Sequence, residues 1–129
     1  MESLQRILHV EDEEDIRKIV AIALSAVGGF TVEQCASGQE ALRKAPLFGP
    51  DLILLDVMMP GMDGPTTLQE LRKLPETAET PVIFMTAKVQ SHEVTRMKDL
   101  GAIEIIAKPF DPMTLSEQIR NIWRQYKAS

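Results

Sequence analysis

Five short apolar segments alternate with helical patterns along this chain, and that alternation restricts the folds open to it more than any other feature. The segments that read as strands are residues 7–10, 31–35, 51–56, 82–85 and 103–107. Each is followed by a stretch whose apolar residues recur at the spacing of one helix face. Strict strand–helix alternation predicts an α/β domain with a parallel sheet and helices on both of its faces.

The composition of the strands also predicts their order. Residues 52–55 are an unbroken apolar run, which is typical of a strand buried on both faces. Segments 31–35 and 103–107 instead contain polar residues, as edge strands do. This pattern favours a flavodoxin-like (βα)5 doubly wound sheet with strand order 2-1-3-4-5. In such a sheet the ligand site lies beyond the carboxyl ends of the strands, between the first strand and the third.

Local signals predict where the helices begin and which faces they bury. Ser37 and Glu40 form a capping box, Pro65 suits the first turn of a helix, and Asp111 with Pro112 is expected to cap the last helix. The first helix should bury Ile16, Ile19, Val20, Ala23, Leu24 and Val27 before ending at Gly28. The last should bury Leu115, Ile119, Ile122, Trp123 and Tyr126.

Length and composition indicate one globular domain over residues 1–129. The single cysteine, Cys35, excludes an intrachain disulfide framework and multi-cysteine metal sites. No apolar run approaches the ~20 residues that span a bilayer, and the first residues do not resemble a secretory signal. We therefore expect a soluble cytoplasmic domain with no membrane partner.

The negative charge of the chain is local. Residues 11–15 are five consecutive acids, and the other acidic residues equal the 14 lysines and arginines in number. A chain without a basic excess is not built to hold a phosphate backbone, so we expect no direct binding of nucleic acid.

Polar side chains stand where the predicted strands end, and together they suggest a site. They are Glu11, Asp12, Asp56, Thr86 and Lys108. Each alone has an ordinary explanation, as a helix-dipole partner, a turn former, a strand cap or a solvated charge. None of these explanations accounts for the convergence of all five residues on the edge where a ligand is expected to bind. Clustered carboxylates repel unless a cation lies between them, and oxygen ligands with room for water suit Mg²⁺.

The same five residues suit phosphoryl transfer to an aspartate. A carboxylate nucleophile between Mg²⁺ and Lys108 can accept a phosphoryl group, because both cations neutralise charge on the transferring oxygens. The Thr86 hydroxyl and the Ala87 backbone N–H are expected to donate to a further phosphoryl oxygen.

Four motifs give the chain an end-to-end resemblance to the receiver domains of two-component response regulators. They are ILHVEDE at 7–13, DLILLDVMMPGMDG at 51–64, VIFMTAK at 82–88 and AKPF at 107–110. The resemblance implies a signalling switch that catalyses only its own phosphorylation and dephosphorylation. Its phosphoryl donor would be a sensor histidine kinase or a histidine phosphotransfer protein.

The resemblance also implies residue roles. Asp56 would be the phosphoacceptor, Asp12 a direct Mg²⁺ ligand, Glu11 a ligand acting largely through water, and the Met58 backbone carbonyl the last protein ligand. Lys108 would bridge to the acceptor, followed by a cis bond to Pro109. Thr86 would move toward the phosphoryl group, draw the following loop with it, and change the face formed by the fourth helix, fifth strand and fifth helix.

One position departs from the family pattern. Ile105 occupies the place where a switching Tyr or Phe is usual, so we expect the signal to depend on loop movement rather than on a rotating ring. The acid pair Glu11-Asp12, in place of two aspartates, should change only the water-mediated contact. His9, within the first strand, is expected to be a packed core residue, and Cys35 a small apolar filler.

Two other functions compete with this interpretation. A Mg²⁺-dependent phosphatase of the haloacid dehalogenase type would need an aspartate two residues after Asp56, where this chain has Met58. A flavodoxin-like cofactor binder would need a phosphate-cradling loop after the first strand, where the acids would repel phosphate. The sequence ends at Ser129, just past the last predicted helix, so we expect output through a downstream effector protein or an output domain outside this sequence.

Overall fold

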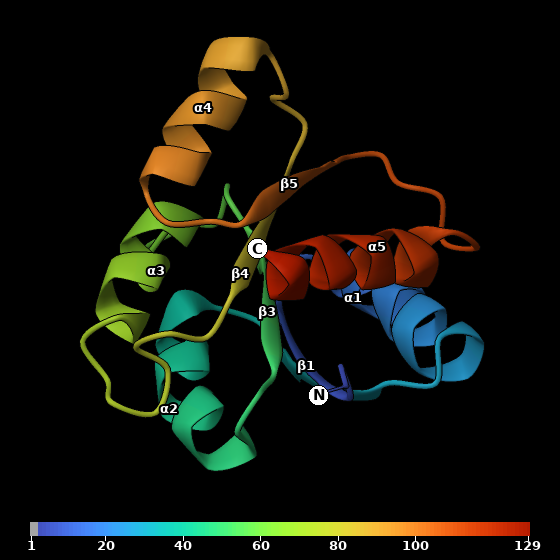
Figure 1. The fold of residues 1–129 in the computed structure, drawn as a ribbon. Helices are drawn as coiled ribbons and strands as arrows, with labels where there is room; N and C mark the ends of the chain where they lie inside the picture. The colour runs from blue at the N-terminus through green and yellow to red at the C-terminus, as the bar shows by residue number, and fades with distance from the viewer. Residues whose placement is uncertain (1–2) are drawn as a thin grey trace.

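Five parallel strands form a single sheet in the order β2-β1-β3-β4-β5, which confirms the predicted topology. The computed structural model describes residues 3–129. The strands are β1 (Arg6–Val10), β2 (Thr31–Cys35), β3 (Leu52–Asp56), β4 (Val82–Thr86) and β5 (Glu104–Ala107). Figure 1 shows β1, β3 and β4 at the centre of the molecule.

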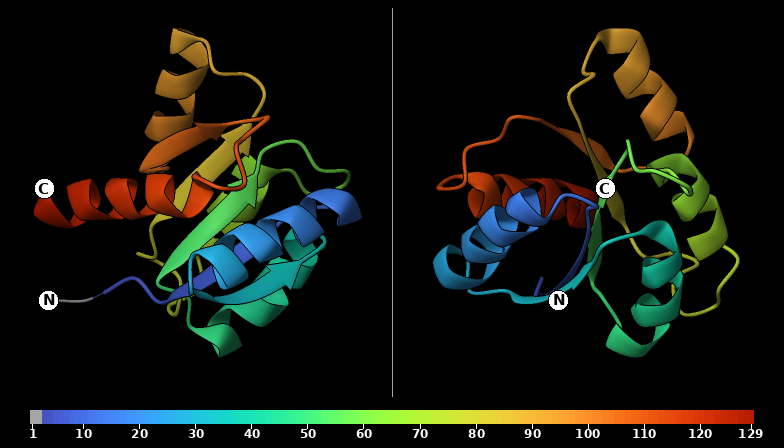
Figure 2. Two further views of the ribbon diagram at one scale, coloured as in Figure 1. Left: turned by 90° about the vertical axis from the view of Figure 1, so that its right-hand side faces the viewer. Right: turned by 180° about the vertical axis from the view of Figure 1, so that it is seen from behind.

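Helices cover both faces of this sheet, and the layers are clearest in the two views of Figure 2. One face carries α1 (Glu14–Ala21), the π-helix η1 (Ile22–Val27) and α5 (Leu115–Ala128). The other carries α2 (Gly38–Phe48), α3 (Gly64–Leu71) and α4 (Ser91–Asp99). Each helix layer packs its own apolar cluster against the sheet.

The two clusters follow from the alternation of side chains along each strand. On β1, Leu8 and Val10 point to the layer of α2, α3 and α4, whereas Ile7 points to the layer of α1 and α5. All residues of β3 and β4 are buried, as the apolar sequences of these central strands predict. β2 and β5 lie at the edges and are only partly buried.

The first helical segment does not bury all the residues expected of it. It changes from α-helix to π-helix at Ile22, and the Gly28 N–H bonds to the Ala23 carbonyl, five residues back. A turn closed by such a bond contains an extra residue, so the later residues rotate away from the spacing that the sequence predicts. Val27 is consequently 45% exposed. Ile19, at the margin of the buried face, is 43% exposed, while Val20, Ala23 and Leu24 are buried as expected.

The last helix begins later than expected. Asp111 does not cap it; its carboxylate accepts from the Met113 N–H, and its carbonyl accepts from the N–H groups of Thr114 and Leu115. These bonds form a separate turn, and α5 starts at Leu115. Leu115, Ile119 and Trp123 are buried as predicted, whereas Tyr126 remains 36% exposed.

The capping box of α2 forms with one change of partner. The Ser37 hydroxyl accepts from the Glu40 N–H, as predicted, but the Glu40 carboxylate accepts from Ala36 rather than from Ser37.

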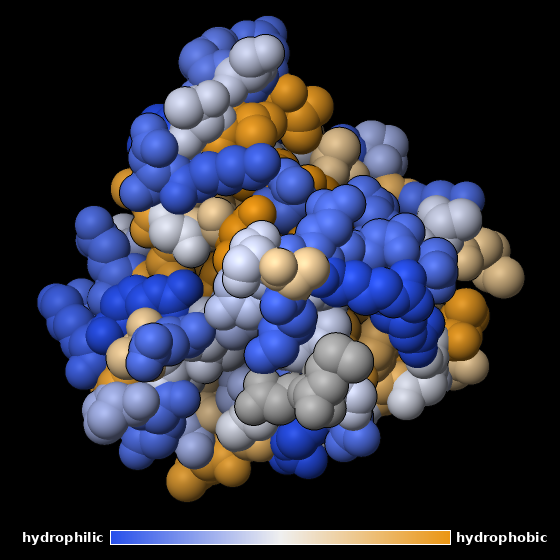
Figure 3. Space-filling view, viewed as in Figure 1, coloured by the Kyte–Doolittle hydropathy of each residue, from blue (hydrophilic) through white to orange (hydrophobic). Residues whose placement is uncertain are grey.

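Hydrophilic side chains cover most of the face in Figure 3, with smaller apolar patches between them. Among the apolar residues that remain exposed are Val89, before α4, and Ile22, in η1. Within residues 3–129, no helix is both long enough and apolar enough to cross a membrane.

Candidate functional site

The residues singled out at the strand ends converge on one edge of the sheet. Glu11 follows β1 directly, Asp56 is the last residue of β3, and Lys108 follows β5. Parallel pairing places Val10 of β1 beside Leu55 of β3, so the residues that follow these two are also neighbours. The order of strands reverses between β1 and β3, and the site lies at this reversal.

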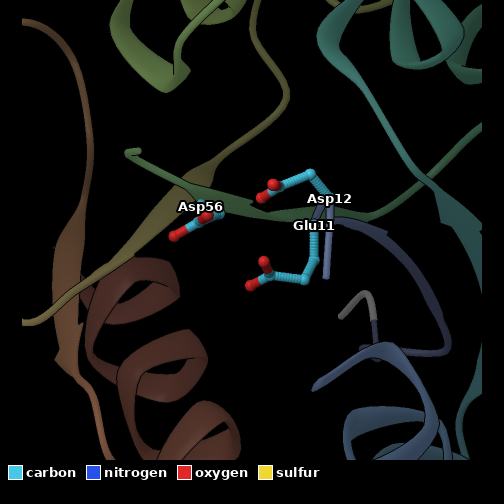
Figure 4. A group of neighbouring side chains, drawn as sticks. All are labelled: Glu11, Asp12 and Asp56. Atoms are coloured by element: carbon cyan, nitrogen blue, oxygen red, sulfur yellow. The ribbon is translucent and has the colours of Figure 1, made fainter. Parts of the chain in front are cut away.

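Three carboxylates share this edge. One carboxylate oxygen from each of Glu11, Asp12 and Asp56 lies within 4.8 Å of the other two. Figure 4 shows the side chains of Glu11 and Asp12 leaving the end of β1 on the side of Asp56. Glu11 and Asp56 are buried, and Asp12 is half-buried. Hard oxygen ligands in this number, with one acid open to solvent, fit Mg²⁺, which binds through one or two carboxylates and keeps several waters.

Lys108 lies between two of these acids. Its Nζ atom is 2.8 Å from Oε1 of Glu11 and 2.8 Å from Oδ1 of Asp56. Only 20% of the Lys108 side chain is exposed, compared with 1% for Glu11 and 4% for Asp56. The ammonium group therefore compensates two negative charges that are nearly removed from water.

Burial and the contact between Glu11 and Lys108 have opposing effects on the pKa values of both groups. Burial raises the pKa of Glu11, the neighbouring Asp56 raises it further, and the hydrogen bond from Lys108 offsets only part of this. Burial by itself lowers the pKa of Lys108, but the hydrogen bonds to Asp56 and Glu11 outweigh it and leave this pKa raised. The structure thus favours the charged form of Lys108 and disfavours the charged form of Glu11. A further cation at the site would stabilise the Glu11 carboxylate in its charged form.

The two oxygens of Glu11 are both engaged by the protein. Oε1 accepts from Lys108, and Oε2 accepts from the Glu13 backbone N–H at 3.2 Å. The carboxylate of Glu11 is therefore less available to a metal ion than that of Asp12.

Thr86 is buried at the end of β4, but its hydroxyl is turned to the loop that follows. Thr86 Oγ1 accepts from the Lys88 backbone N–H at 3.1 Å, and the Thr86 carbonyl accepts from the Lys108 N–H at 2.9 Å. Ala87 is exposed. Thr86 therefore connects the site both to the loop before α4 and to the end of β5.

Ile105 lies outside the cluster of charged side chains. It pairs with Phe84 across β4 and β5, is half-buried, and packs on the apolar cluster beneath α2, α3 and α4. Its connection to the site runs through β4, whose last residue is Thr86.

The loop after β3 brings further residues to the edge of the site. Met58 is 66% exposed, whereas Met59 is buried. At Gly64 the loop comes back to the end of β3, because the Gly64 N–H donates to the Val57 carbonyl at 2.9 Å. A Cβ atom at Gly64 would lie 2.5 Å from the Asp56 carbonyl oxygen, so only glycine allows this approach. Just after β5, the Lys108–Pro109 peptide bond is cis.

Sequence reasoning missed Arg17 and Gln34. The Arg17 guanidinium donates to the carbonyls of Glu11 and Asp12, and the Gln34 amide donates to the Arg17 carbonyl. The sequence does not show that Arg17, and not the adjacent Lys18, bonds to the site, because both residues are predicted to be solvent-exposed charges on a helix.

His9 and Cys35 are buried, as expected of core residues. Burial, with Lys108 and Arg17 nearby, lowers the pKa of His9 to about 3. Burial raises the pKa of Cys35 to about 12, which keeps it a protonated, unreactive thiol.

Known proteins are similar to this chain in sequence and in fold. The family model described as "Response regulator receiver domain" matches residues 7–120. A probable transcriptional regulator, ycf27, from Guillardia theta is 37% identical over 97% of this chain and 48% of its own length. The DNA-binding dual master transcriptional regulator RpaA from Synechocystis is 35% identical over 95% of this chain and half of its own. The chain thus spans about half the length of the curated relatives it matches.

A solved structure matches over nearly its full length. The chemotaxis protein CheY4 of Vibrio cholerae superposes with a TM-score of 0.85 and 32% identity, covering 93% of this chain and 99% of that one. A response regulator from Desulfuromonas acetoxidans gives a TM-score of 0.82, also at 32% identity, over 94% and 98% of the two chains.

Proposed function

Since the chain belongs to the response regulator receiver domain family, whose members are phosphorylation-activated switches of two-component signalling, we propose that Asp56 is its phosphoacceptor. We further propose that residues 1–129 form one receiver domain. Its chemistry is limited to its own phosphorylation and dephosphorylation.

One observation carries this assignment. Glu11 and Asp56 both accept from Lys108 Nζ at 2.8 Å, but Glu11 is also bound through its second oxygen by the Glu13 N–H. Asp56 is bound at Oδ1 by Lys108 and lies within 4.8 Å of carboxylate oxygens from both Glu11 and Asp12. It therefore lies between an ammonium group and the acids suited to a divalent cation. Charge that develops on transferring phosphoryl oxygens would be neutralised from both sides.

The proposed reaction is an in-line displacement at phosphorus. A carboxylate oxygen of Asp56 forms the new P–O bond, the P–N bond to a phosphohistidine of the partner breaks, and the imidazole leaves with the bonding electron pair. The product is an acyl phosphate on Asp56. Lys108 then holds a phosphoryl oxygen, and the Thr86 hydroxyl and Ala87 N–H donate to another.

Asp12, Asp56 and the Met58 backbone carbonyl would hold Mg²⁺, with Glu11 acting largely through water. The engagement of both Glu11 oxygens by Lys108 and the Glu13 N–H supports this division. The metal ion supplies charge neutralisation on the transferring group when bound.

The phosphoryl donor is proposed to be a sensor histidine kinase or a histidine phosphotransfer protein. Output would pass through the face of α4, β5 and α5 to a downstream effector protein or to an output domain. The lengths of the curated relatives, about twice that of this chain, support an output domain in proteins of this kind.

The test is phosphorylation by acetyl phosphate with Mg²⁺, followed by intact-mass measurement. We expect the mass of one phosphoryl group to be added and then lost in alkali, as for an acyl phosphate. Asp56→Asn should abolish the addition, because an amide is not a nucleophile. Asp99→Asn, on exposed α4, is the matched control and should react like the wild type. Undiminished phosphorylation of Asp56→Asn, or unchanged phosphorylation in chelator, would refute the assignment.

A further inference from the structure

The Arg17 guanidinium holds the segment of chain that carries two of the three acids. Its Nη1 atom donates to the Glu11 carbonyl at 2.8 Å and to the Asp12 carbonyl at 3.0 Å. Consecutive carbonyls of an extended strand point in opposite directions because the backbone is pleated. Both can reach one nitrogen only where the chain has left β1, so these two bonds fix how the backbone turns between β1 and α1.

Arg17 is itself held in place by a residue of the edge strand. The Gln34 amide nitrogen donates to the Arg17 carbonyl at 2.8 Å and lies 3.0 Å from Nδ1 of His9. The amide group is the donor, so Nδ1 of the neutral His9 ring accepts and the ring proton is on Nε2. Gln34 pairs with His9 across β2 and β1. A series of hydrogen bonds therefore leads from Gln34 in β2, through Arg17 in α1, to the backbone that carries Glu11 and Asp12.

The site requires such a constraint because its acids repel one another. Carboxylate oxygens within 4.8 Å of each other, two of them on buried residues, favour movement of whichever acid is least fixed. Asp56 belongs to a central strand, and the Glu11 carboxylate is bound by Lys108. Asp12 lies after the strand, so the direction of its carboxylate depends on the backbone that Arg17 holds.

We propose that Arg17 is a positioning residue for the metal site, acting through the Glu11 and Asp12 carbonyls, and that Gln34 supports it by binding Arg17. The inference rests on the proposed function of the site. Residues that orient metal ligands typically change metal affinity 10–100-fold when they are lost.

The sign of the effect separates positioning from charge. A cation near the site repels Mg²⁺, so a purely electrostatic role predicts that removal of Arg17 tightens Mg²⁺ binding. A positioning role predicts the opposite, because the Asp12 carboxylate then loses its fixed direction.

The experiment measures Mg²⁺ affinity of the full chain by isothermal titration calorimetry. Arg17→Met keeps an unbranched apolar stem and removes the donors; we expect binding to weaken about tenfold or more. Lys18→Met is the matched control: it removes the same charge from the next residue, whose side chain is 69% exposed and 3.8 Å from Glu14. This control should bind Mg²⁺ as tightly as the wild type or slightly more tightly.

Two further measurements complete the test. Gln34→Met keeps the length of the side chain without its amide and, like Arg17→Met, should weaken Mg²⁺ binding, here by a few-fold. If Arg17→Met does not fold, the Mg²⁺ affinity of Gln34→Met tests the positioning role instead. With acetyl phosphate, Arg17→Met should be labelled slowly at limiting Mg²⁺ and at nearly the wild-type rate at saturating Mg²⁺. A merely structural defect would not recover in this way.

The outcomes distinguish this inference from the proposed function. Binding of Mg²⁺ by the wild type and its loss in Asp12→Ala support the metal site itself. With those results in hand, Arg17→Met that binds Mg²⁺ as tightly as the wild type, or more tightly, overturns the positioning role and leaves the proposed function standing. Absence of Mg²⁺ binding by the wild type overturns both.

Discussion

The Thr86 hydroxyl accepts a hydrogen bond from the Lys88 backbone N–H at 3.1 Å, so the last residue of β4 is tied to the loop that leads into α4. This contact holds the Thr86 side chain toward the loop. A hydroxyl that turned to a phosphoryl group on Asp56 would break the contact and release the Lys88 N–H. The bond thus offers a direct route from the acceptor site to the position of α4.

We predict that activation displaces residues 87–91 and α4 while Ile105 keeps its rotamer. Ile105 is β-branched, stiff at its first side-chain torsion, and half-buried against the core. The movement should therefore be small, with a coupling free energy of about 1–2 kcal/mol. Structures with and without beryllofluoride test this. An Ile105 side chain that changes rotamer while the loop stays in place would show the prediction to be wrong.

Thr86→Val tests the same route by removing the hydroxyl with little change in shape. We expect Asp56 still to be phosphorylated, because the nucleophile, the acids and Lys108 are untouched. The loop response to phosphorylation should be much reduced. Amide NMR shifts of residues 87–91, recorded with and without beryllofluoride, measure it. A full wild-type response in Thr86→Val would exclude Thr86 as the link.

Lys108→Met should lower the free energy of unfolding by about 3 kcal/mol at neutral pH without metal, because it leaves two buried carboxylates without their ammonium partner. Mg²⁺ should still bind and restore part of this stability. Because the pKa of Lys108 is raised in the folded state, its contribution is present below its ordinary value of 10.5 and is lost as pH rises through the folded value. Urea unfolding with and without Mg²⁺ measures both effects. Equal stability of variant and wild type would contradict the bridging role.

His9→Leu should remove a pH dependence of folding. Burial lowers the pKa of His9 from 6.5 to about 3 in the folded protein. The unfolded chain therefore binds more protons between these values, and His9 makes the protein lose stability as pH falls below 6.5, by up to about 1.4 kcal/mol per pH unit. The difference in unfolding free energy between wild type and His9→Leu should therefore shift by about 2 kcal/mol between pH 7 and pH 5. A constant difference would mean that His9 is not buried as a neutral ring.

Gly64→Ala should destabilise the protein and slow its phosphorylation. The new Cβ would lie 2.5 Å from the Asp56 carbonyl oxygen and 2.8 Å from Cα of Val57, so the loop must move away from the site. Gly49→Ala is the comparison, because Gly49 has a left-handed φ of 65° but open space around it. It should cost about 1 kcal/mol of stability, with no change in acetyl phosphate labelling. Equal effects of the two substitutions on labelling would argue against a role for Gly64 at the site.

The sequence alone predicts the topology of this protein and the members of its site. The uninterrupted apolar residues 52–55, set against Glu33 and Glu104 in the edge strands, predict the strand order, because burial on two faces demands apolar side chains throughout. The same order brings Glu11, Asp56 and Lys108 together, since the ends of neighbouring parallel strands must meet at one edge.

Only the tertiary structure shows how these residues are held. The change to a π-helix at Ile22 exposes Val27, and neither is visible in a pattern that assumes one helical period throughout. Arg17 and Gln34 stand 17 residues apart and meet only because β2 pairs with β1 beside α1. Periodicity and motif spacing report which side chains must be buried, since burial depends on local alternation. They do not report which polar group bonds to which, because such partners are chosen by distances across the folded molecule.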